Sequence, residues 1–412
     1  MNMRQLVVAL AVSVGGLAGL PAAGLAAPVG PDGDAFYVPP APLPAGAKGS
    51  VVWTRPFAGT MALPSAARNL LVLYLSEDPS GKPVAVSGTV AVPKGEPPAG
   101  GWPVITWTHG TIGLAAICAP SRDTATGPEH AYVADIQRLL DKAVAAGYAV
   151  VATDYQGLGV DVFQPFFQGV PNAKNVLDMI RAAREIEPRI GTTYAVMGHS
   201  QGGQADLFTA AIGPTYAPEF RLVGNVAMAP GSNIKGRLDA VIDSAKAELA
   251  VPYVLYVLTS YAHVDPRIDL SRILTQEARA HLPDLYKGCM TAALTQGYWS
   301  TAIARDQFQS NPDLAAFLEM GARNEPGALA ISVPTLILQG TGDQTVRPPD
   351  TDILARDLCA KGITLTYKVF PGQSHDGVME AGAADALGFI DDRFAGKPAA
   401  SNCGALPSST DK

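Results

Sequence analysis

Residues 195–204 read AVMGHSQGGQ, and this stretch joins a short apolar run to a segment compatible with a helix. It predicts a strand, a sharp turn and a helix. Gly198, Ser200 and Gly202 form the pattern GxSxG, the nucleophile elbow, in which the turn lifts a serine hydroxyl above the edge of a sheet. The serine of such a turn is strained, and glycine is needed on both sides because a Cβ there would strike the neighbouring strand or helix. The pattern also arises by chance in a chain rich in Gly and Ser, so its surroundings decide its meaning.

The rest of the chain alternates apolar runs with amphipathic segments. Three opening runs, at 50–57, 69–76 and 83–92, predict antiparallel strands. Further strands are expected at 104–108, 148–153, 194–197, 221–229, 333–338 and 364–370, with helices at 131–146, 173–187, 205–212, 350–361 and 377–394. Strands separated by helices predict a mostly parallel sheet flanked by crossover helices. Together with the elbow, this pattern predicts an α/β-hydrolase fold.

The alternation of strands and helices is interrupted between the predicted strands at 221–229 and 333–338. Helical stretches occupy 238–249, 253–262, 270–282 and 286–295, with prolines between them. We therefore expect residues 50–230 and 329–412 to form the core and residues 231–328, called the cap below, to form a helical lid over the catalytic loops. Residues 28–49 are a Pro/Gly/Ala-rich leader.

The first 27 residues have the layout of a secretory signal peptide: Arg4 near the start, an apolar stretch over 6–20, then small residues. The rival interpretation is an N-terminal membrane anchor. Because the apolar run is short and interrupted by Gly and Pro, cleavage near Ala26 or Ala27 is favoured, which predicts a secreted or periplasmic protein.

The charge composition limits the classes of molecule that the protein is expected to bind. The 412 residues carry a net charge of −7 and no Lys/Arg-rich run, which argues against nucleic acid and anionic membrane surfaces. No later stretch is long and apolar enough for stable membrane insertion. A small-molecule or lipid ester is the expected substrate, with contact to a lipid interface through the cap as a further possibility; the oligomeric state stays open.

The chain has four cysteines, at positions 118, 289, 359 and 403. In an exported protein an even number usually means disulfides, and four cysteines allow three pairings.

The elbow serine needs a base and an acid to orient that base, and on this fold they follow in the order Ser, Asp or Glu, His. His375 lies in a loop after the last predicted strand, whereas His263 and His281 fall in the cap. Asp343 follows the preceding strand.

Two other carboxylates, Asp350 and Asp352, rival Asp343 but are expected to be N-caps of the helix that starts there. The predicted catalytic triad is therefore Ser200, Asp343 and His375, with no metal or cofactor required.

The oxyanion formed during attack on an ester needs two backbone N–H donors. One comes from the residue after the nucleophile, Gln201. The other is expected from the loop after the strand at 104–108, where Thr111 follows His109-Gly110, and His109 is expected to shape this loop.

Four segments resemble the secretory lipase family: 83–93 (PVAVSGTVAVP), 152–159 (ATDYQGLG), 175–184 (NVLDMIRAAR) and 198–204 (GHSQGGQ). The resemblance implies a serine esterase or lipase with a large helical cap and two disulfides. It also implies their pairing, Cys118 with Cys289 and Cys359 with Cys403.

Other functions are compatible with the same residues. An acyltransferase would use the same triad and pass the acyl group to an alcohol, and a catalytically silent binding protein could share the fold. Several aromatic residues are candidates either for a substrate pocket or for the core: Phe163, Phe166, Phe167, Tyr298 and Trp299.

Overall fold

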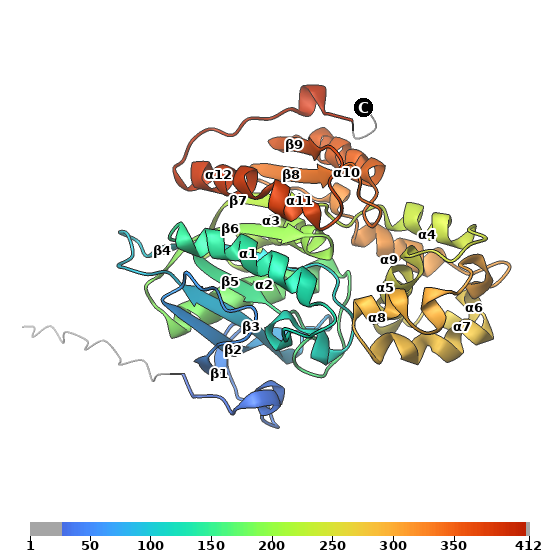
Figure 1. The fold of residues 1–412 in the computed structure, drawn as a ribbon, viewed down its shortest axis with the longest axis horizontal. Helices are drawn as coiled ribbons and strands as arrows, with labels where there is room; N and C mark the ends of the chain where they lie inside the picture. Colours follow the sequence, from blue (N-terminus) through green and yellow to red (C-terminus); the bar gives the residue numbers. More distant parts are fainter. Residues whose placement is uncertain (1–26, 409–412) are drawn as a thin grey trace, which may run out of the picture.

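The computed structural model describes residues 27–408, in which one sheet has the strand order β1-β2-β3-β5-β4-β6-β7-β8-β9 (Figure 1). The expected signal peptide lies outside the described residues apart from Ala27. The strands are β1 (Val51–Pro56), β2 (Arg68–Glu77), β3 (Pro83–Val92), β4 (Trp102–Thr108), β5 (Ala149–Thr153), β6 (Ile190–His199), β7 (Arg221–Met228), β8 (Thr335–Gly340) and β9 (Leu365–Phe370).

The sheet is antiparallel at one edge and parallel over the rest. Strands β1, β2 and β3 pair antiparallel, and β3 meets β5 antiparallel. From β5 through β4, β6, β7, β8 and β9 every pairing is parallel. The mostly parallel sheet expected from the sequence is thus confirmed, and the carboxyl ends of its parallel strands lie at one edge, where ligands bind in such sheets.

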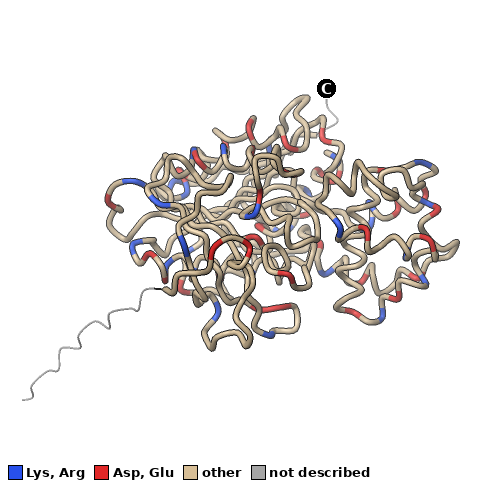
Figure 2. The backbone as a smooth tube through the Cα atoms, turned by 60° about the horizontal axis from the view of Figure 1, so that its bottom comes forward, with Lys and Arg blue, Asp and Glu red and all other residues tan. Residues whose placement is uncertain are grey.

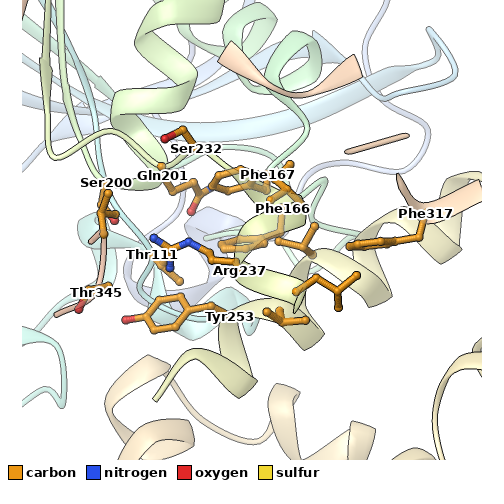
Figure 3. A pocket seen from close by; sticks show the side chains of 16 residues that line it. Thr111, Phe166, Phe167, Ser200, Gln201, Ser232, Arg237, Tyr253, Phe317 and Thr345 are labelled. Atoms are coloured by element: carbon orange, nitrogen blue, oxygen red, sulfur yellow. The ribbon is translucent and has the colours of Figure 1, made fainter. Parts of the chain in front are cut away.

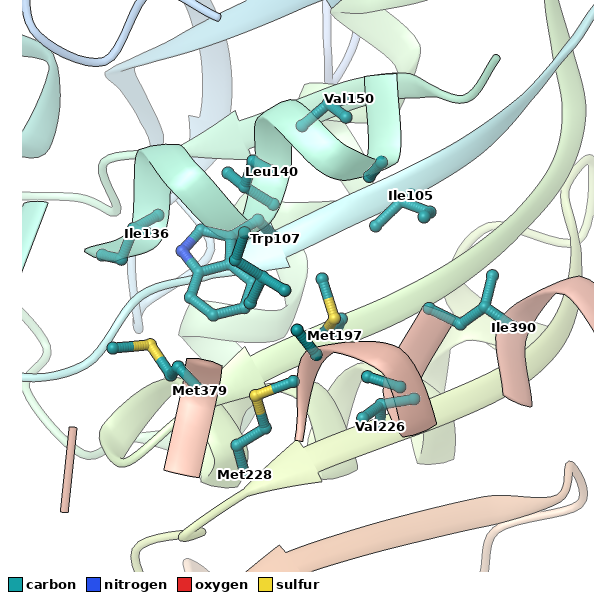
Figure 4. Close-up of a cluster of buried hydrophobic side chains, with 14 of the residues drawn as sticks. Ile105, Trp107, Ile136, Leu140, Val150, Met197, Val226, Met228, Met379 and Ile390 are labelled. Carbon is teal, nitrogen blue, oxygen red and sulfur yellow. The ribbon is translucent and has the colours of Figure 1, made fainter. Parts of the chain in front are cut away.

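Helices cover both faces of the sheet because each has one apolar stripe to bury. One face carries α1 (His130–Ala145), α11 (Gly377–Ala381) and α12 (Ala383–Phe394); the other carries α2 (Gly169–Ile186), α3 (Gln201–Tyr216) and α10 (Pro348–Ala360). Figure 4 shows the first face, where Ile136 and Leu140 of α1 lie over Trp107 and Met197 of the sheet.

Several predicted helices of the core differ in extent; α2, for example, begins at Gly169 rather than at residue 173. The helix after the elbow begins at Gln201, directly behind the serine, rather than at residue 205. The last predicted helix, 377–394, is divided into α11 and α12 at Gly382, where an added Cβ would meet the side chain of Leu338 at 2.7 Å. In the leader, residues 33–37 form a short 3₁₀ turn that buries Phe36 against the sheet.

Helices occupy the chain between β7 and β8, as the sequence predicted. They are α4 (Ile234–Ile242), α5 (Ala250–Val264), α6 (Leu270–Ile273), α7 (Gln276–His281), α8 (Met290–Thr295) and α9 (Ala315–Arg323), and Figure 1 shows them gathered beside the sheet. They pack around α5, whose Leu255, Tyr256 and Tyr261 are completely buried in a cluster of their own. No described helix is long and apolar enough to cross a membrane.

The boundaries of these helices were less well predicted. A helix expected over 270–282 is two short helices, because Thr275 accepts a hydrogen bond from the N–H of Ala278 and so starts α7 as its N-cap. The helix expected over 238–249 is α4, which starts earlier because Asn233 caps it through the N–H of Gly236, and which ends already at Ile242.

Two disulfides join distant parts of the described chain, Cys118–Cys289 and Cys359–Cys403. The first links the loop after β4 to the start of α8, and the second ties α10 to the C-terminal segment. Basic positions are spread among acidic ones along the described chain (Figure 2).

Candidate active site

Ser200 occupies the turn between β6 and α3 with φ +61° and ψ −120°, a conformation that L-residues rarely adopt. Its glycine neighbours have a steric cause. A Cβ on Gly198 would lie 2.0 Å from Oγ1 of Thr108, and one on Gly202 would lie 1.9 Å from the carbonyl oxygen of Thr108. Any side chain at either position would therefore push the turn away from β4.

Strand β7 supports the strained turn. The N–H of Ser200 donates to the carbonyl of Met228 at 2.9 Å, and the N–H of Gly231 donates to the carbonyl of Ser200 at 2.8 Å. The serine backbone is thus held on both sides by groups at the end of the neighbouring strand.

The structure brings the three predicted side chains into one hydrogen-bonded series. Nε2 of His375 lies 2.8 Å from Oγ of Ser200, and Nδ1 of the same ring lies 2.7 Å from Oδ2 of Asp343. The three residues follow β6, β8 and β9, so the parallel sheet itself places them at one edge. A hydroxyl, an imidazole and a carboxylate in this order can deprotonate the hydroxyl as it attacks.

Asp343 is held in its ionised form. Burial alone would raise the pKa of this carboxyl, but the hydrogen bond and charge of His375, together with the N–H groups of Thr345 and Val346, lower its pKa below the ordinary value. Those N–H groups donate to Oδ1 at 2.8 and 2.9 Å. A charged carboxylate can fix the tautomer of the imidazole and stabilise its protonated form.

Thr111 and Gln201 line the same cavity as Ser200. Gln201 is the first residue of α3, so its N–H has no partner within the helix. The N–H of Thr111 lies in the loop after β4. His109 is buried beneath this loop, with its ring nitrogens 2.7 and 3.2 Å from the carbonyl oxygens of Gly110 and Asp154, which fits the loop-shaping role expected of it.

Two residues that the sequence did not single out connect these loops. The hydroxyl of Tyr132 accepts from the N–H of Gly110 at 2.7 Å and lies 2.9 Å from Nδ1 of His199. Nε2 of His199 lies 2.9 Å from the carbonyl oxygen of His375. The only signal was the place of His199 inside the GxSxG pattern; nothing in the sequence pointed to Tyr132.

His199 stays neutral in this chain of hydrogen bonds. Burial, and secondly the charge of the adjacent His375, lower the pKa of His199 to about 3. A neutral ring donates from one nitrogen and accepts at the other. Nε2 therefore donates to the carbonyl of His375, and Nδ1 accepts from the hydroxyl of Tyr132.

Two cavities meet at Ser200. One is lined by Ser200, Thr111 and Gln201 and then by mostly apolar groups, including Phe166, Phe167, Tyr253 and Phe317 (Figure 3). The other lies on the side of His375 and carries two carboxylates, Glu129 and Asp376.

The other aromatic candidates lie elsewhere. The ring of Phe163 stacks on His263 with centroids 3.7 Å apart, and Tyr298 stacks on His281 at 3.8 Å. Trp299 is buried in the core of the helices between β7 and β8. Of the aromatic residues weighed for a pocket, Phe166 and Phe167 are the ones that line it.

The expectation that Asp350 and Asp352 cap a helix is wrong. Helix α10 begins at Pro348, whose fixed φ suits the first helical position, and Arg347 is its N-cap residue. Asp350 instead accepts from the side-chain amide of Asn233 at 2.6 Å and pairs with Arg347, and Asp352 accepts from the hydroxyl of Tyr367 at 2.7 Å.

The Cys118–Cys289 disulfide lies close to the site. Next to it, the N–H of Met290 donates to the carbonyl of Ile112 at 3.0 Å, and Gly113 bridges to Cys289. These contacts fasten the helical segment to the loop that carries Thr111.

One set of metal-ligating groups exists among the described residues, His199, His375 and Asp376. Both histidines already use their ring nitrogens in the hydrogen bonds above, so the arrangement favours acid–base chemistry at this place over metal binding.

The mostly parallel sheet, with a serine on a strained turn after β6 and a carboxylate and histidine after β8 and β9, defines an α/β-hydrolase. Within that class, the family model for secretory lipases matches residues 132–402, and the chain belongs to the secretory lipase family.

Several known proteins are similar over nearly the whole chain. Lipase 6 of Candida albicans is 27% identical over 400 residues, covering 90% of this chain and 83% of the relative. A protein of Mycobacterium tuberculosis named as a probable inactive lipase is 28% identical over 395 residues, covering 90% and 84%. Candida antarctica lipase A in its closed state superposes with a TM-score of 0.72 at 20% identity, covering 88% of this chain and 86% of that structure.

Proposed function

We propose that this protein is an exported carboxylic-ester hydrolase that acts through an acyl-enzyme on Ser200. The observation that carries the proposal is the hydrogen-bonded series from Ser200 through His375 to Asp343, at the carboxyl edge of the sheet. The names of the relatives, which are lipases, support an ester or lipid substrate.

In the proposed reaction, Nε2 of His375 takes the proton from Oγ of Ser200 while Oγ attacks the ester carbonyl carbon. The N–H groups of Thr111 and Gln201 stabilise the resulting oxyanion. His375 then gives its proton to the leaving alkoxide, which departs as the alcohol and leaves an acyl group on Oγ. A water molecule, deprotonated by the same nitrogen, releases the carboxylic acid and restores the serine.

The helices of residues 231–328 would serve as a lid over this site. Residues of α4, α5 and α9 line the cavity that contains Ser200, so substrate reaches the hydroxyl past these helices. The disulfide from Cys118 to Cys289 would keep the lid attached to the oxyanion loop during any opening. Two disulfides and membership of a secretory family also support export.

The first test is the Ser200→Ala variant with p-nitrophenyl esters of graded acyl length. We expect hydrolysis to fall at least 10³-fold, on the order of what removal of a catalytic serine costs. Ser310→Ala is the matched control, because Ser310 is exposed and lines neither of the two cavities that contain Ser200. Unchanged hydrolysis in Ser200→Ala would overturn the assignment.

One relative is named inactive, so activity itself must be measured. Labelling of the wild-type protein at Ser200 by a serine-directed phosphonate is the expected result. Failure of labelling and of hydrolysis together would favour a binding protein on this fold. Adding an alcohol to the assay and measuring the new ester would separate hydrolysis from acyl transfer.

A further inference from the structure

Arg237 extends from α4 into the cavity beside Ser200. Figure 3 shows its guanidinium pointing toward the end that holds Thr111 and Ser200, while Phe317 lies at the opposite end. Its Nη2 is sealed from solvent and has no hydrogen-bond partner in the described structure. Arg237 as a whole is half-buried, but a guanidinium nitrogen that is sealed from solvent without a partner is costly, because its lost hydration is not replaced.

The carboxylates whose charges act on Arg237, Asp350 and Asp343, already have other hydrogen-bond partners. Asp350 accepts from Asn233 and pairs with Arg347, and Asp343 is bound to His375. Burial lowers the pKa of Arg237, but a guanidinium remains charged in proteins. The cavity next to the nucleophile therefore holds a positive charge that these carboxylates do not neutralise.

Two further donors in the same cavity lack partners. Nε2 of Gln201 and Oγ of Ser232 are both buried and make no hydrogen bond, and both residues line the cavity with Arg237. Buried polar groups are nearly always hydrogen-bonded, so such a group calls for a ligand or water. A carboxylate, which accepts about four hydrogen bonds, matches a set made of a guanidinium, an amide and a hydroxyl.

The position of His375 decides which part of an ester enters this cavity. His375 must protonate the leaving alcohol, so the alcohol part lies on its side, in the cavity with Glu129 and Asp376. The acyl part then extends the other way, past Thr111 and Gln201, toward Arg237. A negative charge would be attracted on the acyl side and repelled by the two carboxylates on the alcohol side.

We propose that Arg237 makes this protein selective for esters whose acyl part carries a second carboxylate, that is, monoesters of short dicarboxylic acids. The proposal rests on the proposed function and specifies its substrate class. Arg237 acts here as a specificity-determining residue, with Gln201 and Ser232 as additional donors.

The test compares monoethyl glutarate with ethyl pentanoate, whose acyl chains have the same number of carbons and differ in a terminal carboxylate or methyl group. Ethanol release gives kcat/KM for each. We expect the ratio of the two values to fall roughly 10- to 100-fold in Arg237→Met, the loss of a charge-assisted hydrogen bond. Arg237→Lys should fall less, because it keeps the charge and loses the planar fork.

Lys235→Met is the matched control. Lys235 is an exposed cation on the same helix, paired with Asp239, and it does not line the cavity with Ser200. In Lys235→Met the ratio of kcat/KM for monoethyl glutarate to that for ethyl pentanoate should equal the wild-type ratio.

A second pair of esters places the negative charge on the alcohol part instead of the acyl part. With 4-acetoxybutanoate and butyl acetate the carboxylate belongs to the alcohol part, and the wild-type protein should disfavour the charged ester. The proposal would be overturned if the wild-type protein hydrolysed monoethyl glutarate and ethyl pentanoate with equal kcat/KM. It would also be overturned if the wild-type protein preferred 4-acetoxybutanoate to butyl acetate. Both results are obtained even if Arg237→Met does not fold. Failure of the proposed function looks different: neither monoethyl glutarate nor ethyl pentanoate is then hydrolysed, or both are hydrolysed equally by Ser200→Ala.

Discussion

Replacing Tyr132 with phenylalanine tests whether the loop after β4, which carries Thr111, and the loop after β9, which carries His375, are held by one chain of hydrogen bonds. The hydroxyl of Tyr132 accepts from Gly110 at 2.7 Å and donates to His199 at 2.9 Å, and His199 donates to the carbonyl of His375 at 2.9 Å. Tyr132→Phe leaves the N–H of Gly110 and Nδ1 of His199 without partners. Gly110 and His199 are both buried.

The magnitude follows from these two lost partners. Each unsatisfied buried polar group costs about 1–3 kcal/mol, so with two such groups the free energy of unfolding should fall by roughly 2–6 kcal/mol. Loss of a whole oxyanion donor costs about 10²–10³ in kcat. Because the N–H of Thr111 is retained and only its loop is loosened, kcat should fall about 10- to 100-fold, with KM changing little.

Urea unfolding and steady-state kinetics with p-nitrophenyl butyrate measure the two effects. Tyr148→Phe is the matched control: its hydroxyl bonds Asp391 on α12, away from the site, so stability should fall while kcat stays the same. If Tyr132→Phe lost stability but kept its kcat, the hydroxyl would only support the fold, and the positioning argument would be refuted.

Three further outcomes are expected. Asp343→Asn should lower kcat roughly 10³- to 10⁴-fold without unfolding the protein, since the imidazole loses its orienting charge; stopped-flow or steady-state hydrolysis checks this, and a loss below about 10-fold would contradict it. Gly202→Ala should give an inactive or poorly folded protein, because the new Cβ would lie 1.9 Å from the carbonyl oxygen of Thr108; wild-type kinetics and circular dichroism would disprove the steric argument. Replacing Cys118 and Cys289 together by serine opens a loop with a sequence separation of 171 residues, so urea unfolding should show a loss of roughly 3–5 kcal/mol, and an unchanged midpoint would argue against it.

Much of the fold followed from local pattern. Apolar runs separated by amphipathic segments indicated the strands and helices, and the parallel sheet then followed because crossover helices impose it. The boundaries that failed depended on single residues: Thr275 starts a new helix inside the predicted one, and Pro348 starts α10 ahead of the expected caps.

The candidate site likewise has residues that the sequence predicted and residues that only the structure showed. The sequence alone determined the elbow, because Gly198 and Gly202 are required wherever a serine turns between a strand and a helix. It also indicated Asp343 and His375, because in a parallel sheet the loops after successive strands end at one edge.

Tertiary structure alone decided what surrounds these residues. Tyr132 reaches His199 from a helix 67 positions earlier in the chain, and Arg237 reaches the cavity from a helix that follows another strand. Such contacts depend on how helices pack over the sheet rather than on any local period. For that reason the sequence could indicate the serine, the carboxylate and the histidine, whereas only the packed structure showed the unpaired cation that we propose selects the ester.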